Sequence, residues 1–124
     1  MAKYSRVQFE EMVALAMHRL PERARKHIKN VAVCVQDHPT PEQLKETGMR
    51  RGDTLLGLFE GVPETEWGKG FGNVLPDKIT IFQEGIEQFV DTPEEIEREV
   101  RLTVWHEVAH HFGFTEDDLE QKKM

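Results

Sequence analysis

Two histidines and a glutamate in the last quarter of the chain have the spacing of a metal-dependent hydrolytic site. His106 and His110 lie four residues apart in the pattern His-Glu-x-x-His. On a helix, residues four apart project from one side about one turn apart, so both imidazoles can converge on one zinc ion. Glu107 is rotated about 100° from His106, which suits a general base acting on a water at the metal better than a third ligand. We therefore expect His106 and His110 to bind Zn²⁺ and Glu107 to be catalytic.

The third ligand is expected among the acidic residues that follow Gly113, which extends the pattern to HExxHxxG. In proteins with the extended pattern the third ligand falls three residues after the glycine, and Glu116 occupies that position here. Two histidines and one carboxylate leave a fourth zinc position open for water, as catalysis requires. Asp117 and Asp118 are alternatives, and the same acidic residues would also suit the cap and first turn of a short C-terminal helix. We favour Glu116 over Asp117.

Two other reactive side chains receive structural interpretations. His111 lies 100° past His110, toward the apolar side of the predicted helix, which favours a core histidine hydrogen-bonded to backbone. Cys34 is the only cysteine and stands in the apolar run VAVCV, which is typical of a buried small hydrophobe. Since a cysteine site and an intrachain disulfide are both excluded, metal chemistry must rest on histidine and carboxylate side chains.

The motif stands on the segment with the strongest helix signals. Thr92 is a predicted N-cap, Pro93 suits the first helical position, and Glu95 completes a capping box. An apolar residue then recurs every four positions, at Ile96, Val100, Val104, Val108 and Phe112. This stripe points away from the two histidines, so they can face a cleft while the helix packs on the core.

The rest of the chain alternates helical and strand patterns. Ser5 and Gln8 form a second capping-box pattern that begins a helix ending near Leu20. We expect further helical segments at 21–30 and 41–47, and strands at 31–37, 54–61 and 78–83, the last half-exposed because apolar and polar residues alternate. The glycine-rich stretch 61–76 is predicted to be a long loop that flanks the site.

Length and charge limit the classes of function. The 124 residues suit one domain spanning 1–124, and a net charge of −7 offers no basic stripe for nucleic acid. No apolar run approaches the roughly 20 residues that span a bilayer, and the N-terminus lacks the apolar segment of a signal peptide. We expect a cytoplasmic protein without a membrane or nucleic-acid partner, whose oligomeric state the sequence does not indicate.

Beyond the motif, the sequence resembles the small bacterial zincin-like metallopeptidase family. The resemblance rests on HEVAHHFG together with LLGLFEGVP, LPDKITIF and an N-terminal helix ending in Leu-Pro, and runs from about Phe9 to Leu119. It implies an α+β domain in which helices pack on a small mixed sheet, with His106 and His110 as metal ligands, Glu107 as the catalytic glutamate and Glu116 as the acidic position. It also implies that 79–82 is the edge strand beside the active-site helix, where an extended peptide substrate could add as a further strand.

Three functions fit these patterns. A zinc-dependent metallopeptidase acting on a peptide or protein through a metal-activated water is the leading hypothesis. A non-enzymatic binding module with the same fold is the second, and the presence of Glu107 argues against it because a structural metal site needs no base. A metal-dependent ribosomal RNA endonuclease is the third, and it fits poorly because such sites use a third histidine and this chain is acidic.

Overall fold

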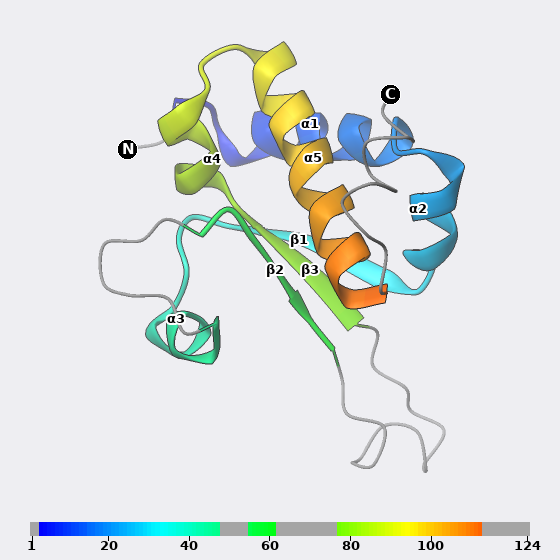
Figure 1. The fold of residues 1–124 in the computed structure, drawn as a ribbon. Coiled ribbons are helices and arrows are strands. Elements are labelled where there is room, and N and C mark those ends of the chain that lie inside the picture. Colours follow the sequence, from blue (N-terminus) through cyan, green and yellow to red (C-terminus); the bar gives the residue numbers. More distant parts are fainter. Residues whose placement is uncertain (1–2, 48–54, 62–76, 113–124) are drawn as a thin grey trace.

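The computed structural model describes residues 3–47, 55–61 and 77–112, which form five helices and three strands (Figure 1). In chain order these elements are α1 (Arg6–His18), α2 (Glu22–His27), β1 (Val31–Gln36), α3 (Pro41–Thr47), β2 (Gly57–Glu60), β3 (Asp77–Phe82), α4 (Gln83–Phe89) and α5 (Pro93–Phe112).

Both predicted capping boxes are present, and each starts a helix that packs on the core. At α1 the Ser5 hydroxyl accepts from Gln8 N at 3.0 Å, and the Gln8 side chain accepts from Ser5 N at 2.8 Å. At α5 the Thr92 hydroxyl accepts from Glu95 N, while the Glu95 carboxylate accepts from Thr92 N. The reciprocal bonds satisfy N–H groups that the first turn of a helix leaves without partners, which fixes where each helix begins.

The sheet is mixed, and its order corrects one expectation. The strands lie in the order β1-β3-β2, with β1 parallel and β2 antiparallel to β3. The expectation that 79–82 forms the edge strand is wrong, since β3 is the central strand and β2 is the outer strand next to α5. The expected half-exposure is also wrong, because residues 79–82 are all buried. A central strand is covered on both edges and both faces, whereas alternation predicts only one buried face.

The helices lie on the two faces of this sheet unequally. α1 and α5 run across one face and pack against each other, with α2 beside the C-terminal part of α5, while α3 lies apart from them near the other face (Figure 1). On that other face Gln43 of α3 donates to Glu60 of β2 and exchanges hydrogen bonds with Gln36 of β1. The α+β fold with helices on a small mixed sheet is therefore confirmed.

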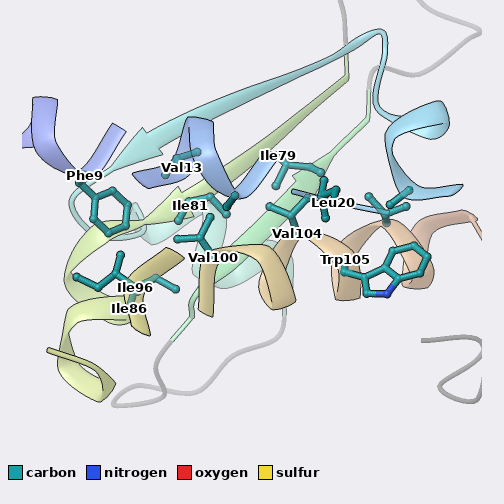
Figure 2. Packing of buried hydrophobic residues seen from close by; sticks show 13 residues of the cluster. Phe9, Val13, Leu20, Ile79, Ile81, Ile86, Ile96, Val100, Val104 and Trp105 are labelled. Carbon is teal, nitrogen blue, oxygen red and sulfur yellow. The ribbon is translucent and has the colours of Figure 1, made fainter. Parts of the chain in front are cut away.

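The core lies between the sheet and the α1–α5 pair (Figure 2). Four residues of the predicted α5 stripe are fully buried, namely Ile96, Val100, Val104 and Val108, whereas Phe112 at the helix end is 38% exposed. They meet Ile79 and Ile81 of β3 and the apolar side of α1. Burial of this stripe fixes the rotation of α5 about its axis, and so decides which residues point away from the core.

Most element boundaries are close to the expected ones. The strand expected over 54–61 is shorter at Gly57–Glu60, and α4 occupies a stretch for which the sequence suggested no element. Cys34 is half-buried rather than buried, because β1 is an outer strand of the sheet. The expected loop over 61–76 lies almost wholly outside the described residues.

Candidate functional site

Three of the predicted site residues, His106, Glu107 and His110, lie in the last two turns of α5, away from the buried stripe. His106 and His110 are exposed, whereas the neighbouring Val104 and Val108 are fully buried. The two imidazole rings are one helical turn apart, with centroids 5.7 Å apart and planes inclined by 26°. The structure thus brings the two histidines together as the four-residue spacing predicts.

The two histidines and Glu107 line a cavity between α5 and the edge strand β2. Its volume is about 460 Å³, and β2 contributes Gly57, Leu58 and Phe59 to its wall. A second cavity of about 340 Å³ shares Leu55, Gly57, His106 and Glu107 with the first, and Leu55, Leu56 and Leu102 form its apolar part. The motif residues therefore lie where two hollows of the surface meet.

The histidine pair fits a zinc ion. A tetrahedral zinc about 2.0–2.1 Å from one nitrogen of each ring would place the ring centroids about 5 Å apart, close to the 5.7 Å found. Imidazole is a preferred zinc ligand, and both rings are open to the cavity. The separation of the two rings is therefore close to the one that a shared zinc ion requires.

The remaining ligand position lies outside the described residues. Within the ranges that the structure describes, no third histidine, cysteine or carboxylate completes a metal-binding group. Gly113, Glu116, Asp117 and Asp118 all follow the last described residue, Phe112. Glu116 as third ligand therefore stays a prediction.

Glu107 is half-buried and is held by the edge strand. The backbone N–H of Phe59 donates to Glu107 Oε1 at 3.0 Å. Burial raises the pKa of the Glu107 carboxyl, and the hydrogen bond from Phe59 opposes that rise because it favours the charged form. A carboxyl in these surroundings is more basic than an exposed glutamate, and this is the direction of pKa shift that suits a general base.

His111 does not have the core position that the sequence favoured. Its ring is exposed, lines the larger cavity, and stacks on Phe59 with centroids 3.7 Å apart. Phe112 packs edge-on against His111 and also contacts His27 of α2, with centroids 4.9 and 4.7 Å apart respectively. The expectation is wrong because the apolar partner on this side of the helix is Phe59 of the edge strand, which a helical wheel does not include.

Sequence reasoning placed 79–82 beside the active-site helix and missed that β2 is the strand that contributes to the site. Gly57 and Phe59 both line the cavity, and Phe59 also contacts both Glu107 and His111. A signal was present, because Gly57, Phe59 and Gly61 recur with the two-residue period of one strand face. A two-residue period shows that these three residues lie on one face of the strand. It does not show which helix packs against that face.

Two further observations concern regions away from the cavity. Tyr4 donates its hydroxyl to the backbone carbonyl of Asp91 at 2.7 Å, near the N-terminal end of α5. None of the helices in the described ranges has the length and apolar character needed to cross a membrane.

Comparison with known proteins identifies the family. A solved structure of a conserved hypothetical protein from Thermus thermophilus shares the fold, with a TM-score of 0.55 and 21% identity over 96% of this chain and 100% of that one. No curated protein gives a significant match. The profile of the zincin-like metallopeptidase family matches residues 28–124, a span that includes the sheet, α5 and the HExxH motif. This chain therefore belongs to the zincin-like metallopeptidase family.

Proposed function

We propose that this protein is a zinc-dependent peptidase in which His106, His110 and Glu116 hold the metal and Glu107 is the general base. The family supports a metallopeptidase type of fold and a peptide or protein as substrate. The observation that carries the proposal is the placement of His106, His110 and the Glu107 carboxylate on one cavity wall. A domain that only needed structural metal would have no use for a partly buried base at that place.

In the proposed hydrolysis, Glu107 transfers the proton, and the carbonyl and the water are activated at the metal. When bound, zinc supplies the Lewis acidity that polarises a carbonyl and lowers the pKa of water to about 7. Glu107 accepts the proton of the attacking water and passes it to the leaving amine, so the base is regenerated in each turnover. The Phe59 N–H holds Oε1 of Glu107, which leaves Oε2 to take up that proton.

The substrate would lie along β2 rather than along 79–82. β2 is an outer strand of the sheet and forms one wall of the cavity. An extended peptide presents its carbonyl groups at regular intervals, so binding beside such a strand would bring one scissile carbonyl opposite the two histidines. The apolar wall formed by Leu55, Leu56 and Leu102 would accept an apolar side chain of the peptide.

A peptide-library digest tests the proposal. The zinc-loaded protein and its Glu107→Ala variant are each incubated with a mixed library, and the products are read by mass spectrometry. We expect fragments that appear with the parent and are absent with the variant. If the fully loaded parent releases no fragment that the variant does not also release, the protein is a zincin-shaped binding module instead.

A further inference from the structure

A regular set of contacts joins the edge strand to the active-site helix. Phe59 N–H bonds to Glu107, and the neighbouring glycines of the same strand face lie beside helix residues four positions before and after it. A Cβ added to Gly57 would meet the Thr103 side chain, and one added to Gly61 would come within 3.8 Å of His111. The contacts thus pair every second strand residue with every fourth helix residue.

This pairing follows from the dimensions of the two elements. Two residues of an antiparallel strand advance about 6.8 Å, and four residues of a helix advance about 6.0 Å. A strand running along a helix can therefore repeat the same contact at three successive positions. Over a longer stretch, the difference between the two advances would bring the residues out of register. Glu107 occupies the middle position, so its surroundings depend on the contacts on both sides.

The Gly57 contact is much the tighter of the two glycine contacts. A Cβ at Gly57 would lie 2.6 Å from Thr103 Cγ2, a separation that real Cβ atoms essentially never show. A Thr in a helix has two common χ1 rotamers, so the added Cβ would require either that Thr103 exchange the places of its methyl and hydroxyl groups or that the strand move away. At Gly61 the nearest atoms would be 3.6 Å away, an ordinary contact. Of the two glycines, only Gly57 must therefore lack a side chain for β2 to lie this close to α5.

The Phe59 N–H is available for Glu107 because of the strand register. Phe82 N donates to Leu56 O, so Leu56 and, by alternation, Leu58 and Glu60 direct their backbone groups toward β3. The intervening Phe59 directs its N–H away from β3, where Glu107 receives it at 3.0 Å. A hydrogen bond of this length tolerates little increase in the separation of strand and helix.

We propose that Gly57 is a positioning residue: its missing side chain sets the distance between β2 and α5 at Thr103, and this distance lets Phe59 N–H orient the Glu107 carboxylate. The inference rests on the proposed role of Glu107 as base, since positioning has catalytic meaning only for a group that reacts. Adding one methyl group at Gly57 would move the strand outward and detach Glu107 from Phe59. Removing the methyl group of Thr103 would restore the space.

The experiment compares Gly57→Ala, Gly57→Ala with Thr103→Ser, and the matched control Gly61→Ala. Amide hydrogen exchange of Phe59 in zinc-free protein reports its hydrogen bond directly, with Glu107→Ala as the reference for a lost bond. We expect Phe59 exchange to become about 10- to 100-fold faster in Gly57→Ala and in Glu107→Ala, relative to the amides of buried residues in β3. In the double variant the Phe59 amide should exchange at the parent rate. In Gly61→Ala the Phe59 exchange rate should also equal that of the parent.

Activity is the second readout. In zinc-loaded protein, Gly57→Ala should lower kcat/KM by about 100-fold through displacement of the base, and Thr103→Ser should rescue it.

If Phe59 exchanges equally fast in the parent, Gly57→Ala and Glu107→Ala, the inference is overturned even when the parent cleaves peptides. If Gly57→Ala does not fold, the Glu107→Ala reference still tests the bond and the double variant tests the spacing. If the parent cleaves nothing, the proposed function fails, while the exchange pattern still decides whether Gly57 positions Glu107.

Discussion

Two glutamates on α5 lie in opposite electrostatic surroundings. Glu95 in the first turn is fully exposed, and hydrogen bonds from Thr92 and Asp91 lower the pKa of its carboxyl. Glu107 in the fourth turn is half-buried, and burial raises the pKa of its carboxyl despite the bond from Phe59. The charged form is therefore favoured at one end of the helix and disfavoured at the other.

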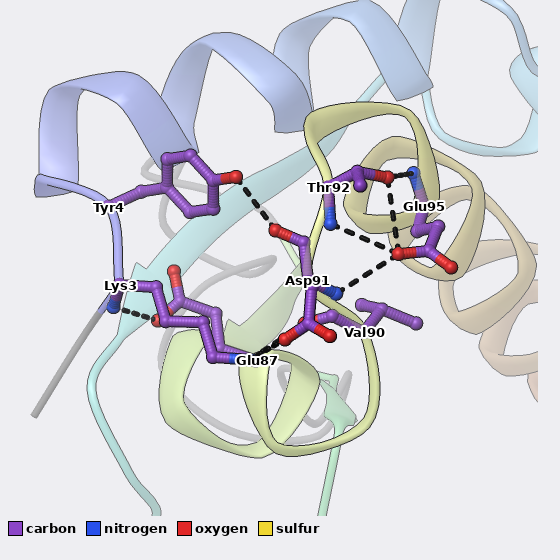
Figure 3. A network of polar contacts seen from close by, with 7 residues as sticks. All are labelled: Lys3, Tyr4, Glu87, Val90, Asp91, Thr92 and Glu95. Carbon is purple, nitrogen blue, oxygen red and sulfur yellow. Dashed lines mark hydrogen bonds and ion pairs between the residues drawn. The ribbon is translucent and has the colours of Figure 1, made fainter.

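The N-terminal end of α5 is a densely bonded junction (Figure 3). Glu95 accepts from the backbone of Asp91 and from both the backbone and hydroxyl of Thr92. The segment around Lys3 and Tyr4 ties the chain start to the same place, through Lys3–Asp91 and Tyr4–Asp91 contacts. Each group there has an ordinary structural role, capping a helix or anchoring a neighbouring segment.

The C-terminal end of α5 has a different composition. His106, His110, His111 and Phe112 are all exposed there, although the helix behind them packs on the core through Val104 and Val108. Basic side chains in the last turn suit the helix dipole, whereas the partly buried Glu107 carboxylate carries a desolvation cost. One helix therefore combines an end held by capping and anchoring contacts with an end where we place the proposed chemistry, and a single buried stripe joins the two.

The largest expected effect concerns activity. Glu107→Gln should lower kcat/KM by about 10²- to 10⁴-fold, the usual contribution of a general base, with the zinc content unchanged. The matched control is Glu95→Gln, the same substitution three turns earlier, which should keep the activity of the parent. The variants are compared in a peptide cleavage assay with metal analysis. Glu107→Gln with more than a tenth of the parent rate would remove the proposed functional distinction between the two ends.

Stability should respond at the buried stripe and not at the histidines. Ile96→Ala should lower the free energy of unfolding of the zinc-free protein by about 2–5 kcal/mol, because Ile96 is fully buried and its loss leaves a cavity. His110→Ala should change it by no more than about 0.5 kcal/mol, as is usual for an exposed position. Urea unfolding measures both values. A similar cost for the two variants would contradict the division of α5 into structural and chemical ends.

The identity of the third metal ligand can be tested by comparing Glu116 with Asp117. Glu116→Ala should weaken zinc binding by at least about 100-fold, since even loss of an outer-shell partner of a metal site can cost that much. Asp117→Ala is the matched control and should bind zinc like the parent. Competition with a chromogenic chelator measures both affinities. A Glu116→Ala protein that retains the parent affinity, together with a weakened Asp117→Ala protein, would transfer the ligand role to Asp117.

The smallest effect concerns the pH dependence of stability at the N-terminal end. Because the pKa of Glu95 is lowered on folding, its charged form contributes stability above its unfolded value of 4.5, and that stability is lost as the pH falls through the folded value. Glu95→Gln should therefore melt at a lower temperature than the parent at pH 7, and the gap should close at acid pH. Melting curves between pH 7 and pH 3 test this. A gap that stays constant would show that the charge of Glu95 does not contribute.

The local features of α5 could be predicted because their interactions span only a few residues. The Thr92 capping box, the buried stripe and the approach of His106 to His110 each depend on spacings of three or four positions. Helical geometry converts such spacings directly into neighbours. The α+β class, by contrast, was implied by the family resemblance.

The pairing of strands could not be predicted in this way. β3 is central and β2 is the outer strand, the reverse of what was expected for 79–82. Strand order depends on contacts between segments far apart in the chain, and alternation within one strand shows only how its two faces differ. The misplaced His111 has the same origin, because its partner Phe59 is 52 positions earlier in the chain.

Residue spacing is therefore enough to tell which residues share one side of α5, since a helix closes its hydrogen bonds within four residues. What that side faces depends on the packing of distant segments. The approach of β2 at Gly57 and the bond from Phe59 N–H to Glu107 join parts of the chain that are 46 and 48 residues apart. No local spacing encodes them, because they arise when burial of the α5 stripe places the helix against one particular edge of the sheet.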